Sequence, residues 1–144
     1  MMLFPSLEWF ETVRVAYNAD PRFHGGGAGA CTAEVGIKVG EALFALSFGG
    51  RDCTQAAVIT AEDLPRLDFY LDMPVAAWRA MLANICEHGH AVDEQTLNTL
   101  DLDSDDGIAH SATGDQYRTD LFFRFNQTFQ NFFDAAAGVD TRFE

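Results

Sequence analysis

The segment that decides the fold runs from residue 31 to residue 48 and reads CTAEVGIKVGEALFALSF. Between Cys31 and Val39, apolar residues alternate with polar residues or glycine, which is the period of a β-strand with one buried face. Phe44, Leu46 and Phe48 alternate in the same way in the second half. Gly40-Glu41 stands between the halves, and a two-residue turn with glycine first favours a tight hairpin. The segment therefore predicts two antiparallel strands.

Further strand patterns follow this hairpin. Gly49-Gly50 is a second turn signal, and it leads to a less regular strand over residues 51–60. Residues 67–72 alternate again, with Leu67, Phe69 and Leu71 on one side, and residues 107–112 could add a short fifth strand. With helices before and after the strands, these patterns predict an α/β protein of the α+β type. Its sheet is expected to be five-stranded and mainly antiparallel, with the first strands forming a meander.

Helical spacing marks two segments beside the predicted sheet. Residues 6–18 have apolar residues on one face, and Ser6 can cap the first turn. Residues 74–88 begin at Pro74, whose fixed φ suits the start of a helix, and end before Gly89. The apolar face of this second helix contains Val75, Trp78, Met81, Leu82 and Ile85.

The last predicted helix carries the largest apolar face of the chain. It is expected to run unbroken for about 20 residues after a capping box at Thr113-Gly-Asp-Gln116. Six of the 13 phenylalanines lie between Phe122 and Phe133. The side chains that recur at helical spacing are Leu121, Phe122, Phe125, Phe129, Phe132 and Phe133. Such a face closes either a filled core or a cavity for an apolar ligand, and periodicity does not separate the two.

Two other segments connect the predicted elements. Residues 93–100 have the pattern of a short helix, and an acidic loop follows them. His24–Ala30 is rich in glycine but precedes a strand instead of opening a helix. It therefore lacks the dinucleotide-binding fingerprint and is interpreted as a linker.

Composition predicts a single domain over residues 1–144, because 48% hydrophobic residues suffice for one core. The formal charge of −13 opposes binding to nucleic acid and docking to anionic membranes. No apolar run is long enough to span a membrane, so stable membrane insertion is not expected. The three cysteines are widely spaced and odd in number, which favours a reducing, cytoplasmic location over a disulfide framework.

Two patterns resemble metal sites without completing one. The acidic loop from Asp101 to Gly107 spaces carboxylates as a calcium loop does, but Ala112 stands where a bidentate glutamate is needed. Cys86, His88 and His90 offer three zinc ligands, and no fourth is evident nearby. We therefore expect no metal and no cofactor.

Catalytic patterns are equally sparse. The chain has no Gly-x-Ser-x-Gly elbow, and no pairing of a nucleophile with a histidine stands out. Asp68, Asp72 and His110 could act as acid and base beside a pocket, as in a cone-shaped ketosteroid-isomerase-like enzyme. Because that fold ends in long strands and this chain ends in a predicted helix, we expect no enzyme activity and no catalytic residues.

The order of these patterns resembles the sterol carrier protein type-two family, in its small stand-alone bacterial members. The resemblance covers nearly the whole chain. It rests on the meander, on the strand at 67–72 running into Pro74-Val-Ala-Ala-Trp-Arg-Ala-Met-Leu82, and on two flanking segments. Those segments are Leu3-Phe-Pro-Ser-Leu-Glu-Trp-Phe10 and Asp120-Leu-Phe-Phe-Arg-Phe-Asn-Gln-Thr128.

The resemblance implies helices packed on one face of the sheet, a hydrophobic tunnel, and non-enzymatic carriage of sterols, fatty acids or fatty acyl-coenzyme A. The acidic surface makes a neutral sterol-like or fatty ligand easier to accommodate than one with a phosphate-bearing tail. The expected lining has a floor, a wall and a lid. It comprises Phe44, Leu46, Phe69, Trp78, Met81, Leu82, Ile85, Phe122, Phe125, Phe129 and Phe132.

The functional prediction is therefore a cytoplasmic lipid binder whose partner is an apolar lipid. A homodimer is an additional state that the sequence leaves open. Two alternatives to the lipid binder remain, namely a protein-interaction module with a filled core and the ketosteroid-isomerase-like enzyme.

Overall fold

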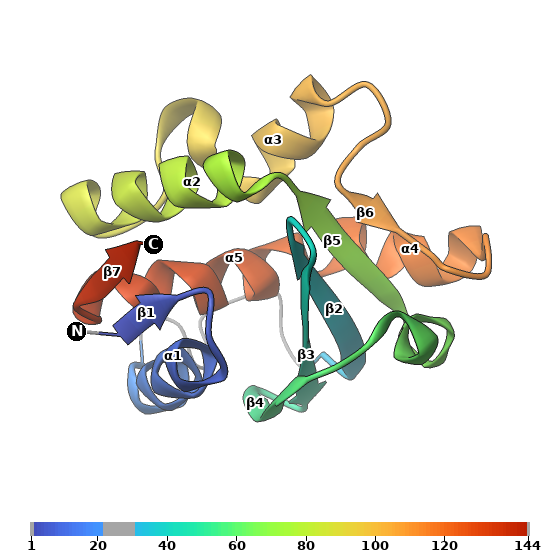
Figure 1. Ribbon diagram of the computed structural model, residues 1–144, viewed down its shortest axis with the longest axis horizontal. Coiled ribbons are helices and arrows are strands. Elements are labelled where there is room, and N and C mark those ends of the chain that lie inside the picture. Colours follow the sequence, from blue (N-terminus) through green and yellow to red (C-terminus); the bar gives the residue numbers. More distant parts are fainter. Residues whose placement is uncertain (1, 22–30, 144) are drawn as a thin grey trace.

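A five-stranded sheet forms one layer of the protein and the longer helices form the other (Figure 1). The computed structural model describes residues 2–21 and 31–143. The strand order across the sheet is β4-β3-β2-β5-β6. The bounds are β2 (Ala33–Val39), β3 (Ala42–Gly49), β4 (Asp52–Val58), β5 (Phe69–Met73) and β6 (Ala109–His110).

Strands β2, β3 and β4 form the predicted antiparallel meander. Gly40 has a φ of +61°, a left-handed conformation that suits glycine in the hairpin turn. The register between β3 and β4 shifts at Ser47 and Phe48, which accounts for the less regular pattern of β4 in the sequence. The predicted meander is confirmed for these strands.

The fourth predicted strand does not continue the meander. After the short 3-10 helix η1 (Ala61–Arg66), the chain crosses to the far side of β2, and β5 pairs with β2 in parallel. Gly36 allows the two strands to approach closely at this point, because a Cβ there would lie 2.7 Å from the Cβ of its partner Tyr70. β6 then pairs antiparallel with β5, so the sheet is mainly but not wholly antiparallel.

The first two long helices have the predicted bounds within one residue. In α1 (Leu7–Ala19), the Ser6 hydroxyl accepts a hydrogen bond from the Trp9 backbone N–H, as expected of an N-cap. In α2 (Val75–His88), Pro74 precedes the first turn and Gly89 ends the helix with a φ of +85°. Both helices turn their apolar faces into the core.

The prediction of a single C-terminal helix is wrong. The segment divides at Phe125 into α4 (Gln116–Arg124) and α5 (Asn126–Asp134), because Phe125 has φ −121° and ψ 25°, which are not helical. The division allows Phe122 to reach β5 while α5 stays packed between α1 and α2. The expected capping box is also wrong, because Asp115 is the N-cap and accepts from the N–H groups of Tyr117 and Arg118.

The remaining elements are short. The region expected to hold one helix contains the 3-10 helix η2 (Asp93–Gln95) and α3 (Leu97–Asp103), and the 3-10 helix η3 (Ala135–Gly138) follows α5. Strands β1 (Met2–Phe4) and β7 (Thr141–Phe143) pair in parallel, so the two ends of the described chain lie side by side (Figure 1). The sequence pattern did not reveal this pair. The linker predicted over residues 24–30 lies outside the described residues.

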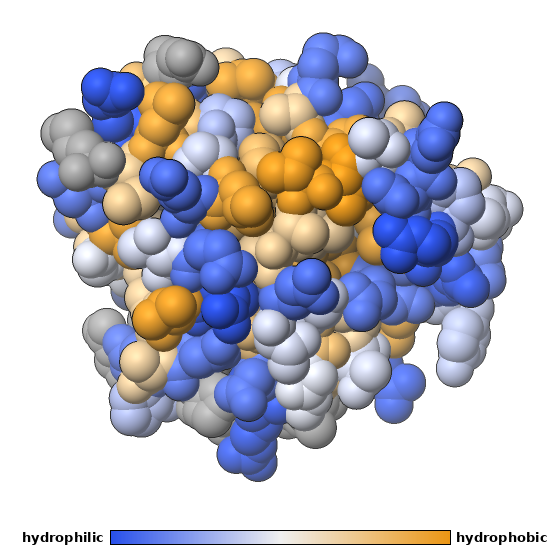
Figure 2. Space-filling view, turned by 60° about the horizontal axis from the view of Figure 1, so that its bottom comes forward, coloured by the Kyte–Doolittle hydropathy of each residue, from blue (hydrophilic) through white to orange (hydrophobic). Residues whose placement is uncertain are grey.

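Figure 2 shows a face on which apolar side chains gather near the middle and hydrophilic side chains surround them. Among the described residues, no helix combines the length and the apolar character needed to cross a membrane.

Candidate apolar site between the sheet and α5

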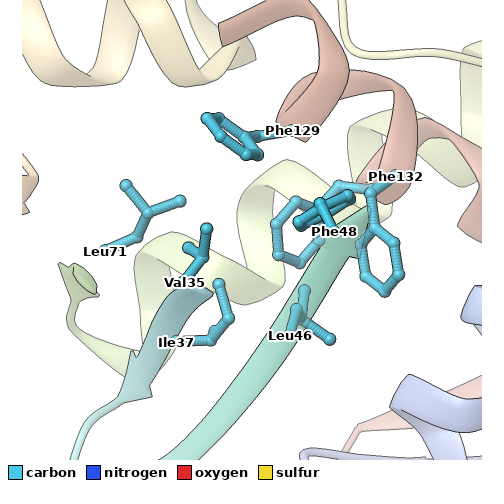
Figure 3. A pocket seen from close by; sticks show the side chains of 8 residues that line it. Val35, Ile37, Leu46, Phe48, Leu71, Phe129 and Phe132 are labelled. Atoms are coloured by element: carbon cyan, nitrogen blue, oxygen red, sulfur yellow. The ribbon is translucent and has the colours of Figure 1, made fainter. Parts of the chain in front are cut away.

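An enclosed apolar space lies between the inner face of the sheet and α5. No water-sized sphere fits between its side chains, so the space consists of narrow gaps within a packed core. Figure 3 shows the labelled side chains of both layers pointing toward one another. The lining residues are Val35, Ile37, Leu46, Phe48, Leu71, Phe129, Phe132 and Phe133.

The two periodicities of the sequence bring these side chains together. Alternation along β2, β3 and β5 turns one set of apolar residues toward the helices. Steps of three and four along α5 turn Phe129, Phe132 and Phe133 toward the sheet. The ring of Phe48 meets the rings of Phe129 at 5.4 Å and Phe132 at 6.1 Å between centroids, both edge to face. These contacts are favourable arrangements for aromatic rings, so the resting structure is closed and well packed.

Three of the predicted lining residues line this space, namely Leu46, Phe129 and Phe132. Phe69 and Phe122 form a second layer behind them. The Phe69 ring lies 5.3 Å from Phe129 and 6.0 Å from Phe122. A continuous series of ring contacts therefore leads from α4 to the enclosed space.

The other predicted lining residues lie elsewhere. The α2 side chains that were expected to form a wall are buried against α5 and η3. Among them, the Trp78 ring lies 5.2 Å from the Phe133 ring, and the Trp78 Nε1–H donates to the Lys38 carbonyl oxygen. Met81, Leu82 and Ile85 are fully buried on the same helix face. Phe44 faces inward as expected, but it packs against Phe10 at 4.6 Å.

Phe125 is only half-buried at the junction of α4 and α5, and it does not line the enclosed space. The residues that the sequence-based lining omitted are Val35, Ile37, Phe48, Leu71 and Phe133. Three of them, Phe48, Leu71 and Phe133, belong to the same periodic patterns as predicted lining residues. Val35 and Ile37 lie on β2, where no lining residue was predicted.

No ionised thiol or phenol adjoins the site at neutral pH. Burial raises the pKa of Tyr17 to about 12, and the Tyr17 ring packs against Phe48 and Phe132. Burial also raises the pKa of Cys53 to about 12 and that of Cys31 to about 11. The two thiols are therefore protonated and poorly nucleophilic.

The predicted metal-like segments have structural partners. Asp101 is buried, and its Oδ1 accepts a hydrogen bond of 2.7 Å from the Ile108 N–H, which closes the acidic loop. His88 and His90 each place Nδ1 near a backbone carbonyl oxygen, of Asn84 and Ala91 respectively. Within residues 2–21 and 31–143, no group of three or more His, Cys, Asp and Glu side chains is arranged to hold a metal ion.

The predicted acid–base candidates lie away from the enclosed space. Asp68 accepts a hydrogen bond from the Glu34 N–H, and Asp72 lies 3.7 Å from the Lys38 ammonium. The His110 ring lies 5.7 Å from the ring of Tyr70, which alternates with the inward-facing Phe69 and Leu71. These groups therefore occupy the face of the sheet opposite α5.

Comparisons of this chain with protein-family models, with curated proteins and with solved structures find no match. The resemblance to sterol carrier proteins thus stays a prediction.

Proposed function

We propose that this protein binds one apolar lipid, of the fatty acid or fatty acyl class, between its sheet and α5. The observation that carries the proposal is the enclosed space, whose lining residues are all apolar. A chain inserted there would be held by burial of apolar surface, at about 25 cal/mol per Å². In this proposal, the expected hydrophobic tunnel is the form that the same space takes when the ligand is bound.

The closed packing favours a flexible chain over a rigid ring system. Since no water-sized sphere fits in the space, a ligand enters only when rings such as Phe48, Phe129 and Phe132 turn aside. An acyl chain can pass between rings with local rotations. A fused sterol would require the sheet and α5 to separate over a wider area, so sterol-like ligands rank second.

The proposed role is non-enzymatic carriage of the lipid within the cytoplasm. The charge of −13 supports a ligand without phosphate groups, because acidic surface repels them. Palmitic acid should therefore bind more tightly than palmitoyl-coenzyme A.

Native mass spectrometry of the purified protein tests the proposal directly. The protein is measured before and after incubation with palmitic acid, cholesterol and palmitoyl-coenzyme A. A one-to-one palmitate adduct, or a co-purified lipid released by organic solvent, is the expected result. A mass that stays that of the bare chain with all three ligands would overturn the proposal.

Two matched substitutions test the location. Phe129 lines the space and Phe10 does not, although both rings are almost completely buried. Phe129→Leu should weaken palmitate binding, whereas Phe10→Leu should leave the palmitate affinity unchanged. Both variants should lose a similar amount of folding stability. Equal palmitate affinity in both variants would show that the ligand binds elsewhere.

The closed packing also favours a second candidate function, an interaction module with a filled core. In that case the protein would have a protein partner or form a homodimer, and it would retain no lipid. Gel filtration with light scattering at two salt concentrations, in parallel with the lipid measurement, separates the two functions. A salt-sensitive assembly without any lipid adduct would favour the interaction module.

A further inference from the structure

Helix α4 exposes two aromatic side chains to solvent. Tyr117 is 78% exposed and Phe123 is 46% exposed, while Leu121 is partly buried. The two rings are six positions apart, which is about 240° around a helix of 3.6 residues per turn, so they face different directions. Of the two, Tyr117 lines the hollow described next. The large exposed hydrophobic side chains of the described chain are Leu7, Val15, Val58, Leu102, Tyr117 and Phe123.

The outer side of α4 carries one charge of each sign beside an aromatic ring. Tyr117, Asp120, Leu121 and Arg124 line a shallow hollow of about 140 Å³. Among the described residues, no carboxylate forms an ion pair with the Arg124 guanidinium, which lies 5.4 Å from the centre of the Phe125 ring. The Asp120 carboxylate accepts one hydrogen bond, from the Gln116 side chain. The hollow is therefore neutral overall, on a chain whose net charge is −13.

These groups match the two charges of a zwitterionic phospholipid head group. A guanidinium binds phosphate oxygens well, because its N–H groups form a planar fork. A quaternary ammonium is attracted to the face of an aromatic ring and to a carboxylate. Aromatic side chains with a polar edge also favour the depth of the head groups. An anionic membrane fits less well, because the rest of the protein surface would repel it.

The opposite side of α4 faces the proposed lipid site. Phe122 is its one fully buried residue, and the Phe122 ring lies 6.0 Å from Phe69 and 6.4 Å from Phe129. Figure 1 shows α4 at the end of the molecule away from the paired chain ends. One helix thus separates the outer hollow from the series of rings that leads to the enclosed space.

We propose that the outer side of α4 docks onto a zwitterionic phospholipid surface, with Arg124 at the phosphate and Tyr117 with Asp120 at the ammonium group. Docking there would serve the proposed lipid binding, on which this inference rests, because it brings the membrane next to Phe122. The contact is peripheral, since α4 has only nine residues.

Co-sedimentation with vesicles tests the docking surface. The full chain is mixed with phosphatidylcholine vesicles and, separately, with phosphatidylglycerol vesicles. The wild-type protein should bind phosphatidylcholine and avoid phosphatidylglycerol. Tyr117→Ser should lower the partition coefficient by roughly tenfold, whereas Leu102→Ser, at a site that is 73% exposed, should leave it unchanged. Arg124→Gln should lower it as well, and Arg142→Gln on the exposed surface of β7 should not.

Several results would overturn the inference. They are equal binding by Tyr117→Ser and Leu102→Ser, binding that rises with the phosphatidylglycerol fraction, or no binding to any vesicle. If no vesicle is bound but palmitate adducts form in native mass spectrometry, docking fails and the proposed function stands. If phosphatidylcholine is bound through Tyr117 and no adduct ever forms, the docking surface stands and the proposed lipid site fails.

Discussion

The side-chain amide of Asn18 binds the backbone of Cys53 in the way that a neighbouring β-strand would. Its Nδ2 donates to the Cys53 carbonyl oxygen and its Oδ1 accepts from the Cys53 N–H, both at 2.9 Å. The Arg14 guanidinium donates a further hydrogen bond to the same carbonyl oxygen at 3.2 Å. β4 is an edge strand, and open edges promote pairing between molecules. The C-terminal part of α1 therefore both packs on the sheet and covers this part of its edge.

Replacing Asn18 should expose that edge. Asn18→Ala leaves the Cys53 N–H without its partner, and we expect the free energy of unfolding to fall by about 1–2 kcal/mol. Chemical denaturation measures the loss, and light scattering on warming should detect earlier aggregation. Asn98→Ala, on the exposed side of α3, serves as the control and should stay within about 0.5 kcal/mol of the wild type. Equal stability of the two variants would mean that the Asn18 amide contributes nothing net.

A second prediction concerns the hydrogen bond between α1 and β7. The Trp9 indole is completely buried, and its Nε1–H donates to the Thr141 hydroxyl at 2.9 Å. Thr141→Val has a similar shape but no acceptor, so it should cost about 1–3 kcal/mol. Thr54→Val is the control, because the Thr54 hydroxyl is exposed. The prediction fails if both variants unfold at the same denaturant concentration.

The thiols should differ in reactivity. Burial raises the pKa of all three thiols, but Cys31 and Cys53 are buried whereas Cys86 is exposed to solvent. We expect an aromatic disulfide reagent to modify one thiol per native chain at neutral pH and all three in denaturant. Cys86→Ser should abolish the native reaction. Reaction of a second thiol at a comparable rate would show that the sheet and α1 separate readily.

Asp134 should make stability depend on pH. Burial raises the pKa of its carboxyl above the ordinary 3.8, although hydrogen bonds from the Ala91 N–H and the Gln130 side chain act the other way. The folded state therefore favours the protonated form. This contribution to stability is fully present below pH 3.8 and is lost as the pH rises through the folded-state pKa.

Asp134→Asn separates this effect from the general charge of the protein. The amide stays neutral and can keep the acceptor oxygen, so the variant should gain stability over the wild type as the pH rises toward neutrality. Denaturation curves at pH 4 and pH 7 measure this difference. Asp103→Asn removes an exposed carboxylate and should show a much smaller change with pH. A gain of equal size in both variants would assign the effect to net charge.

The sequence predicted the elements that have a long, regular pattern. The alternation of β2 and β3, the Ser6 cap and the Gly89 stop are all local signals, and the structure confirms them. The parallel pairing of β5 with β2 has no local signal, because alternation tells which side of a strand is buried and not which strand lies beside it. Strands β1 and β7 have three residues each, which is too short for a pattern.

The division at Phe125 was hidden for a different reason. No glycine or proline marks it, and the apolar spacing continues from Phe122 through Phe129 as if the helix were unbroken. Tertiary contacts of Phe122 with Phe69 and of α5 with the sheet accompany the division. The same limit applies to the site, because the sequence predicted which side chains are buried but not which of them leave space between them.

The pairing of β1 with β7 has a consequence for synthesis on the ribosome. Met2 lies opposite Thr141 in the register, so the first strand to leave the exit tunnel must wait for the last one. Until then the rings of Phe4 and Trp9 lack Phe143 and the Thr141 hydroxyl as neighbours. Contacts of such long sequence separation form late and slowly. A nascent chain that has released only β1 to β6 therefore has its sheet but lacks the β1–β7 pair.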